Sequence, residues 1–452
     1  SRTDTTAMTY DTATGWLTST GKNKGFLTAV KNAAVSTYYR YNDAGQPYWE
    51  RHDVAGAGSY DVARTYHPSG ELLRAELPKG TGQGRAATPD YLYDAAGRVI
   101  QFGSYVTNVT YNLRGQPERM DFGSGVYTSN DYQNQTGWLN STRVYNASNA
   151  YIDRRHYYRH PSGRVNRQYS DYARSRLNYC YDYTGRLLVS ADLDKAGLNC
   201  TTVGSWTGSE AQDQFFSYRP DGSMASNDHI GSYSYAGSPV AHAPASVAGQ
   251  AFTYDANGNM TKGLDGKVMT YDGENRPLSV SLDGNTTQYV YGADGTRLQR
   301  IETVDGQTTT TLYAGGVEIV NPGAADEEVH WYPHENLRLS YANGSFKEVK
   351  YLHRDQLGSV FAITGANGLS DTRRGFAPFG DELETVSDAA MASYPAKEDT
   401  GFIGEREDEA AGLMYLNARY YDPELAGFIP ADPALEPANT NAAPAPAKAA
   451  TQ

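Results

Sequence analysis

The chain of 452 residues is poor in aliphatic residues, in long apolar segments and in basic charge. It has no apolar run near the roughly 18 residues that a membrane-spanning helix needs, so we expect no membrane-spanning segment. Its net charge of -13 argues against nucleic acid as a main partner, because phosphate binding needs a basic face. Hydrophobic residues make up 39% of the chain, but many of them are tyrosines, so burial must come from aromatic sheet faces.

Cysteine occurs only twice, at Cys180 and Cys200. Cys180 lies in a strand-like segment with tyrosine on either side, and Cys200 ends a polar insertion. A disulfide between them would close a loop of about twenty residues and contribute roughly 3 kcal/mol in the chain-entropy model. The sequence leaves two states open here, one disulfide or two free cysteines.

Tyrosine and glycine are abundant, with 37 and 46 copies. Tyrosine is repeatedly followed, four residues later, by glycine or asparagine. This frame recurs at Tyr41, Tyr66, Tyr93, Tyr111, Tyr181, Tyr218, Tyr254, Tyr271 and Tyr291. Unrelated hairpins in an ordinary β-sandwich would not keep the two residues in a fixed frame so often. Recurrence on a period of about two dozen residues is typical of a repeat architecture, and we predict an all-β array of antiparallel hairpins.

Each copy of the frame has a physical interpretation as a hairpin turn. The aspartate that often follows the tyrosine can accept a backbone N–H two residues on. Glycine then stands where a type I turn with a glycine bulge needs positive φ, and Asn275 fits because asparagine tolerates that region. The arginine after the glycine, as at Arg98, is predicted to lie along the ring of the next tyrosine.

After residue 350 the sequence pattern changes, and the segments there differ from the preceding hairpin units. The residues resemble the Rhs, or YD-repeat, family over nearly the whole chain. The most specific part is an ordered string similar to the family's core segment: Tyr351-Leu-His-Arg-Asp-Gln-Leu-Gly358, Pro378-Phe-Gly380, Thr400-Gly-Phe-Ile-Gly404, Leu416-Asn-Ala-Arg-Tyr-Tyr-Asp422-Pro and Asp432-Pro. The resemblance implies that the repeats spiral into a hollow β-cage and that the core curls inside to plug one end.

We therefore expect three parts: a repeat array over 1–340, a core-like plug over 341–433, and a tail over 434–452. The tail is rich in alanine and proline and has no aromatic residue, a composition that cannot bury a core. The chain opens at Ser1 within a repeat-like unit and shows no signal peptide, so we expect a fragment or a processed product.

The resemblance also implies chemistry that this chain lacks in part. Self-cleaving family members use two aspartates, of which one matches Asp432 and the other lies in a downstream Asp-Pro-x-Gly segment. No aspartate follows Asp432, so we expect a remnant rather than a catalytic dyad, and no enzyme activity. Asp422 is expected to end a strand in a turn. Where the family pattern has Gly-Arg-Phe, this chain has Ala426-Gly427-Phe428, which leaves the packing around a missing arginine open.

Other motifs point to no cofactor or metal. His330 and His334 have zinc spacing only on a helix, which Pro333 disfavours. The segment from Asp255 to Asn259 faintly resembles a calcium loop, but a hairpin turn explains the same residues. The string His353-Arg-Asp invites a kinase interpretation, yet no glycine-rich phosphate loop accompanies it.

The function that these features favour is the C-terminal part of a β-cage shell that encapsulates a toxin or cargo segment in a secreted bacterial polymorphic toxin. The expected partner is then a tethered or enclosed C-terminal polypeptide. The alternative is an extracellular structural or adhesive protein at the cell surface, without cargo. In that case tyrosine-rich faces would contact neighbouring subunits or carbohydrate.

Overall fold

The computed structural model describes residues 6–11, 25–170, 175–194, 197–202, 213–240, 242–386 and 398–430. Their strands form three large antiparallel sheets and one small one, and in each sheet the strands follow chain order without a crossover. The described residues also contain three single-turn 3₁₀ helices, η1 (Leu264–Gly266), η2 (Phe402–Gly404) and η3 (Glu409–Ala411). None of the helices among these residues is long and apolar enough to span a membrane. The predicted all-β array of antiparallel hairpins is confirmed.

Sheet 1 has seven strands: β1 (Ala7–Tyr10), β2 (Leu27–Lys31), β3 (Val35–Tyr41), β4 (Pro47–Val54), β5 (Gly58–Tyr66), β6 (Leu72–Pro78) and β7 (Arg85–Ala87). Sheet 2 has fifteen: β8 (Tyr91–Tyr93), β9 (Val99–Phe102), β10 (Val106–Tyr111), β11 (Pro117–Phe122), β12 (Tyr127–Tyr132), β13 (Leu139–Tyr145), β14 (Tyr151–Arg159), β15 (Val165–Ser170), β16 (Ser175–Tyr181), β17 (Leu187–Ala191), β18 (Gln214–Tyr218), β19 (Met224–Asn227), β20 (Gly231–Ser234), β21 (Ser246–Val247) and β22 (Gln250–Ala251).

Sheet 3 has fourteen strands: β23 (Thr253–Tyr254), β24 (Met260–Lys262), β25 (Val268–Tyr271), β26 (Pro277–Leu282), β27 (Asn285–Tyr291), β28 (Arg297–Val304), β29 (Gln307–Ala314), β30 (Val317–Val320), β31 (Glu328–His334), β32 (Leu337–Ala342), β33 (Ser345–Arg354), β34 (Val360–Gly365), β35 (Ser370–Phe376) and β36 (Glu382–Val386). The fourth sheet has β37 (Arg406–Asp408), β38 (Leu413–Tyr415), β39 (Tyr420–Asp422) and β40 (Gly427–Phe428).

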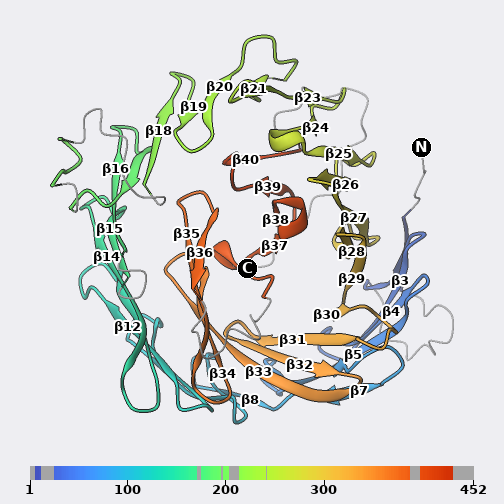
Figure 1. Ribbon diagram of the computed structural model, residues 1–452. Helices are drawn as coiled ribbons and strands as arrows, with labels where there is room; N and C mark the ends of the chain where they lie inside the picture. Colours follow the sequence, from blue (N-terminus) through green and yellow to red (C-terminus); the bar gives the residue numbers. More distant parts are fainter. Residues whose placement is uncertain are drawn as a thin grey trace.

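The three large sheets form a curved wall, and the fourth sheet lies inside it (Figure 1). We call residues 398–430, which carry this small sheet, the plug. Sheet 3 continues across the boundary that the sequence placed between residues 340 and 341. The first two core-like units, which we expected to differ from the hairpin units, are the further hairpins β33–β34 and β35–β36 of the same sheet.

The repeat turns take the conformation that the frame predicts. At Tyr93 to Gly97, the glycine has φ of 75° and its N–H donates to the carbonyl of Asp94. The Asp94 carboxylate accepts the N–H of Ala96 and of Arg98, which closes the turn. Asn275, the asparagine variant of the frame, has φ of 63°. The same left-handed residue stands at Asn149, four residues after a tyrosine that our sequence prediction omitted.

The repeat tyrosines connect successive hairpins. The Tyr93 hydroxyl donates to the carbonyl of Leu72 at 2.8 Å, and Leu72 lies two residues after the glycine of the preceding turn. Other copies donate to the equivalent carbonyl at 2.7 to 2.8 Å: Tyr66 to Pro47, Tyr111 to Val99, Tyr271 to Met260 and Tyr291 to Pro277. Each ring thus packs over the preceding strand while its hydroxyl satisfies a carbonyl there.

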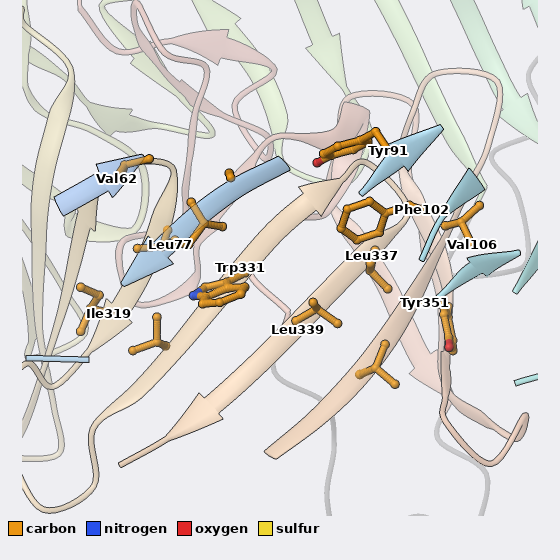
Figure 2. Close-up of a cluster of buried hydrophobic side chains, with 14 of the residues drawn as sticks. Val62, Leu77, Tyr91, Phe102, Val106, Ile319, Trp331, Leu337, Leu339 and Tyr351 are labelled. Carbon is orange, nitrogen blue, oxygen red and sulfur yellow. The ribbon is translucent and has the colours of Figure 1, made fainter. Parts of the chain in front are cut away.

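The main hydrophobic core lies between sheet 3 and the other two large sheets. Figure 2 shows Trp331 and Leu339 of sheet 3 packed against Leu77 of sheet 1. The Trp331 indole is fully buried and donates to the carbonyl of Pro78 at 2.7 Å. Because side chains alternate along a strand, the opposite face of sheet 3 is free to carry polar residues toward the plug. We call that opposite face the inner face of sheet 3.

Candidate functional site: the plug and the inner face of sheet 3

The plug packs on sheet 3 through a second hydrophobic cluster. Leu413, Tyr415 and Tyr420 of the plug contact a group that includes Met269 and Tyr289 of the wall. The Tyr289 and Tyr420 rings lie 4.8 Å apart between centroids. The repeat frame cannot explain these contacts, because the residues that touch are more than a hundred positions apart in the chain. The plug is therefore held in place by tertiary burial.

A buried carboxylate on the plug, Asp408, is the centre of the polar contacts. Its Oδ2 lies 2.6 Å from Nη1 of Arg297, and its Oδ1 lies 2.8 Å from Nη1 of Arg300. The Tyr289 hydroxyl donates to Oδ2 at 2.9 Å. The three charged side chains are nearly inaccessible to solvent. An uncompensated charge at this depth costs several kcal/mol, so each of the three partners depends on the others.

Three further ion pairs join the plug to the inner face of sheet 3. They link Arg300 to Asp399 at 2.5 Å, Arg338 to Glu398 at 3.0 Å, and Arg406 to Glu318 at 2.6 Å. Burial alone would raise the pKa of Glu318, but Arg406 and His330 outweigh it and hold that pKa below its usual range. The pairs thus keep charged side chains in place on a face that the plug largely covers.

The end of the plug is held by a separate salt bridge. Lys267 Nζ lies 2.6 Å from Oδ2 of Asp422 and donates also to the carbonyl of Gly412 at 3.1 Å. Both charged side chains are buried. Asp422 ends β39, and its Oδ1 accepts the N–H of Leu425 at 2.9 Å. The predicted strand-end turn is present at Asp422, and the salt bridge to Lys267 adds a role that the sequence did not indicate.

Two other carboxylates beside this bridge retain their protons more readily than usual. Burial, reinforced by the charge of Asp422, raises the pKa of Asp381 to about 6. Burial, reinforced by Asp265 and Asp422, raises the pKa of Glu424 to about 7. The environment of Lys267 and Asp422 is therefore acidic and sensitive to pH near neutrality.

A cavity of about 500 Å³ lies on the inner face of sheet 3, next to Asp399 of the plug. Val320 is the only aliphatic residue among the described residues that line it. Its charged or titratable lining residues are Arg300, Glu302, Glu318, Asp326, Glu328, His330, Arg338, Lys347, Glu348, Lys350 and Asp399. Most of them pair with one another, as Lys347 does with Glu328 at 2.5 Å. At this cavity the inner face therefore offers paired charge rather than an apolar surface.

The structure also places the other residues that the sequence singled out. Asp432 lies outside the described residues. His330 and His334 lie on strand β31, and no cluster of three metal-binding side chains occurs within the described part of the chain. The Nε2 of His330 lies 3.5 Å from Oε2 of Glu328. Asp255 accepts the N–H of Asn257 and of Asn259, as a hairpin turn requires.

Two further motifs have structural roles. His353 is fully buried, bonds to Thr128 at 2.9 Å and to Thr364 at 3.0 Å, and has its pKa lowered to about 3 by burial. The missing family arginine would stand at Gly427, and beside it the guanidinium of Arg419, between β38 and β39, lies over the ring of Phe428 at 3.8 Å. An arginine from β38–β39 therefore covers this aromatic ring.

Cys180 and Cys200 form a disulfide, which settles the alternative that the sequence left open. Cys180 is buried among Val189, Ala191 and Leu193. The disulfide ties the insertion that follows β17 to strand β16.

The residues that sequence reasoning missed are Lys267, Arg297, Arg300 and Asp408. Arg297 does carry a local signal, because it follows the turn at Gly295 by two residues, but nothing near it indicates a partner at Asp408. The only available hint was the unusual content of charged residues in strands whose alternate positions are apolar.

No protein-family model matches the chain. Among curated proteins, the tRNA3(Ser)-specific nuclease WapA of Bacillus spizizenii is 31% identical over 195 residues, which are 41% of this chain. The tRNA nuclease WapA of Bacillus subtilis strain 168 is 30% identical over 193 residues. The matched region spans 8% of the length of each relative.

Solved structures of larger toxin assemblies resemble most of the chain. The crystal structure of TcdB2-TccC3 superposes with a TM-score of 0.75 over 95% of this chain and 24% of that one, at 17% identity. The TccC3-containing Tc holotoxin pore of Photorhabdus luminescens gives a TM-score of 0.73 over 91% of this chain, at 16% identity. The hairpin frame, the curved wall and the enclosed plug agree with this likeness: the chain has the Rhs, or YD-repeat, shell fold.

Proposed function

We propose that this chain is the C-terminal part of an Rhs-type shell that encapsulates a toxin or other cargo polypeptide in a secreted bacterial toxin. The observation that carries the proposal is the inner face of sheet 3. This face lies inside a curved wall, is lined by paired charges, and is partly closed by the plug. The similarity to TccC3-containing Tc toxin structures and to WapA nucleases supports the same assignment.

A shell suits such a cargo for a physical reason. An unfolded polypeptide exposes apolar side chains, and these adhere to apolar patches. The side chains that line the cavity on the inner face are mostly charged and paired with one another, so they give the apolar side chains of an unfolded chain little to bind. Many apolar side chains of the wall are instead buried between sheet 3 and the other two large sheets, and others, such as Met269 and Tyr289, are covered by the plug.

The first test is the intact mass of the natural protein, with mass-spectrometric sequencing beyond both ends of this chain. A separate polypeptide that stays with the shell and resists trypsin while enclosed would support the proposal. The variant Asp408→Asn should make that polypeptide sensitive to trypsin, because it weakens the plug. A matched control, Asp131→Asn, changes an exposed strand residue and should leave the protection intact. A uniform chain with no companion polypeptide would overturn the proposal.

The second candidate is an extracellular structural or adhesive protein. It is favoured by a row of stacked rings on sheet 2, where Tyr127 and Tyr145 lie 4.6 Å apart and Tyr151 continues the row at 4.7 Å from Tyr145. Such a row can contact a neighbouring subunit or stack on a sugar face. Glycan-array binding that is lost in Tyr151→Ala, with no companion polypeptide in the native material, would favour this candidate.

We also propose that the chain itself is not catalytic. The support is the sequence after Asp432, which supplies no second aspartate. The test is the mass of the purified chain after prolonged incubation at several pH values. Cleavage that the variant Asp432→Asn abolishes would overturn this part of the proposal.

A further inference from the structure

A second cavity, of about 380 Å³, lies between the wall and the turn that joins β33 to β34. Strands β14 to β17 supply one side, the turn at Asp355 to Leu357 supplies another, and Phe376 and Phe402 complete it. None of the side chains of the Asp408 ion-pair group lines it. We call it the arginine cavity, because three arginines point to it: Arg155, Arg159 and Arg164.

Two of these arginines, Arg159 and Arg164, have no ion pair among the described residues, and the exposed Arg164 lies over the ring of Tyr181 at 5.5 Å. Arg159 donates to the carbonyl of Gly163 at 2.9 Å, and Arg164 donates to the Ser162 hydroxyl at 3.2 Å, so both bind neutral acceptors. The Nε of Arg159 is buried and makes no hydrogen bond to a described residue. A donor without a protein partner can bind a ligand that enters the cavity.

The cavity has fewer acidic than basic side chains in its lining. Asp355 is the only described carboxylate that lines the cavity. Its carboxylate accepts the N–H of Leu357 and of Ser359, both at 2.9 Å, and burial raises its pKa. Burial also lowers the pKa of Arg159, which shows that no strong acid partner stands beside it. The cavity is thus positive within a chain whose net charge is -13.

Apart from Gln168 and Gln356, the remaining lining residues are apolar or aromatic, among them Tyr179, Tyr181, Leu187, Phe376 and Phe402. Such surfaces bind a hydrophobic body, while a few placed polar groups fix its orientation. Gln356 adds one such group, because its Oε1 is buried and has no hydrogen-bond partner among the described residues. It would accept an N–H from a ligand.

We propose that the arginine cavity binds an amphipathic carboxylate whose charge meets Arg159 and Arg164 and whose aromatic or aliphatic body packs on the surrounding rings. An adjacent N–H would donate to Gln356. Two sources share this chemistry: an N-acyl amino acid with a free α-carboxylate, which resembles the end of a chain, and an acidic side chain within a peptide. This inference does not depend on the cargo that the shell holds.

Isothermal titration calorimetry with two probes separates the sources. N-acetyl-L-phenylalanine carries an α-carboxylate, and N-acetyl-Phe-Glu-amide carries only a side-chain carboxylate. We expect saturable binding of at least one probe. The probe that binds more tightly shows whether the site prefers an α-carboxylate or a side-chain carboxylate. Arg159→Gln and Arg164→Gln should each weaken binding at least tenfold, because each removes one charge from the site. Arg119→Gln, on β11 outside the cavity, should leave the affinity unchanged.

The uncharged N-acetyl-L-phenylalaninamide is the decisive comparison. Equal binding of this amide, or no effect of Arg159→Gln and Arg164→Gln, would overturn the proposal. So would the absence of saturable binding up to about 10 mM of both carboxylates. If Arg159→Gln does not fold, as judged by its thermal unfolding, Arg159→Lys keeps the charge and must still bind the probe better than the amide.

Discussion

The guanidinium of Arg98 lies over the ring of Tyr111, with 4.4 Å from its central carbon to the ring centroid. The same arginine forms a salt bridge with Asp94, four residues earlier, at 2.5 Å. Arg98 therefore joins the aspartate of one turn to the tyrosine of the next. The pairs Arg186 with Tyr218 and Arg276 with Tyr291 repeat this arrangement at 4.8 and 4.7 Å. The predicted stacking of the arginine on the next tyrosine is confirmed.

Removal of one repeat hydroxyl should weaken the shell measurably. The variant Tyr111→Phe loses the hydrogen bond to the carbonyl of Val99, which we expect to lower the free energy of unfolding by about 1 kcal/mol. Urea-induced unfolding followed by circular dichroism measures the change. The matched control is Tyr183→Phe, whose side chain is 96% exposed and should leave the stability unchanged. Equal stability of both variants would contradict the proposed role of the hydroxyl.

The left-handed turn residue is a second sensitive position. Gly97 has φ of 75°, so Gly97→Ala should lower the free energy of unfolding by about 1 to 2 kcal/mol. At Asn275 the same geometry holds a side chain whose Oδ1 accepts hydrogen bonds from Asn257 and Asn259, so Asn275→Gly should lose those bonds, and Asn275→Ala should lose them and strain the turn as well. Thermal unfolding of the three variants orders them. A neutral Gly97→Ala would show that this turn adopts another conformation in solution.

Loss of the Asp408 carboxylate should loosen the plug. In Asp408→Asn the guanidinium groups of Arg297 and Arg300 stay buried without their shared anion, and we expect a loss of about 3 to 5 kcal/mol. Hydrogen exchange should rise first in residues 398–430 and in β27 and β28. Exchange that rises equally across sheet 1 would indicate global unfolding instead of release of the plug.

The disulfide should stabilise the insertion and the adjacent wall. The double variant Cys180→Ala with Cys200→Ala removes a bond between residues 20 positions apart. We expect a loss of about 3 kcal/mol by the chain-entropy model, measured by chemical denaturation. Treatment of the unmodified protein with a reductant should give a similar loss, and no loss in either case would mean that strand pairing alone holds the insertion.

Stability should also fall as pH rises toward neutrality near the end of the plug. Burial raises the pKa of Asp381 from 3.8 to about 6 and that of Glu424 from 4.5 to about 7, so the folded state binds protons that the unfolded state has released. The stabilisation from these groups is complete below about pH 4 and is lost as pH rises through about 6 to 7. The double variant Asp381→Asn with Glu424→Gln should remove this component. Identical pH profiles for the variant and the parent would contradict it.

The local features of the fold could be predicted, because they lie within a few residues of one another. The turn at Gly97, the cap at Asp94 and the stacking of Arg98 all follow from one repeat. The plug contacts could not be predicted in the same way. Lys267 and Asp422 are 155 positions apart, and nothing in the residues beside either one specifies the other. Such pairs depend on how the sheets curve, which is set by the whole array and not by any single turn.

The order of strands within the sheets bears on how the molecule is made. Each strand of the three large sheets pairs with its neighbours in the chain, so the hydrogen-bonded ladders of the wall need only short-range contacts and can grow hairpin by hairpin as the polypeptide leaves the ribosome. Lys267 can form its salt bridge only after Asp422 has been synthesised. The contact between Lys267 and Asp422 therefore forms only after every strand of the three large sheets has been synthesised.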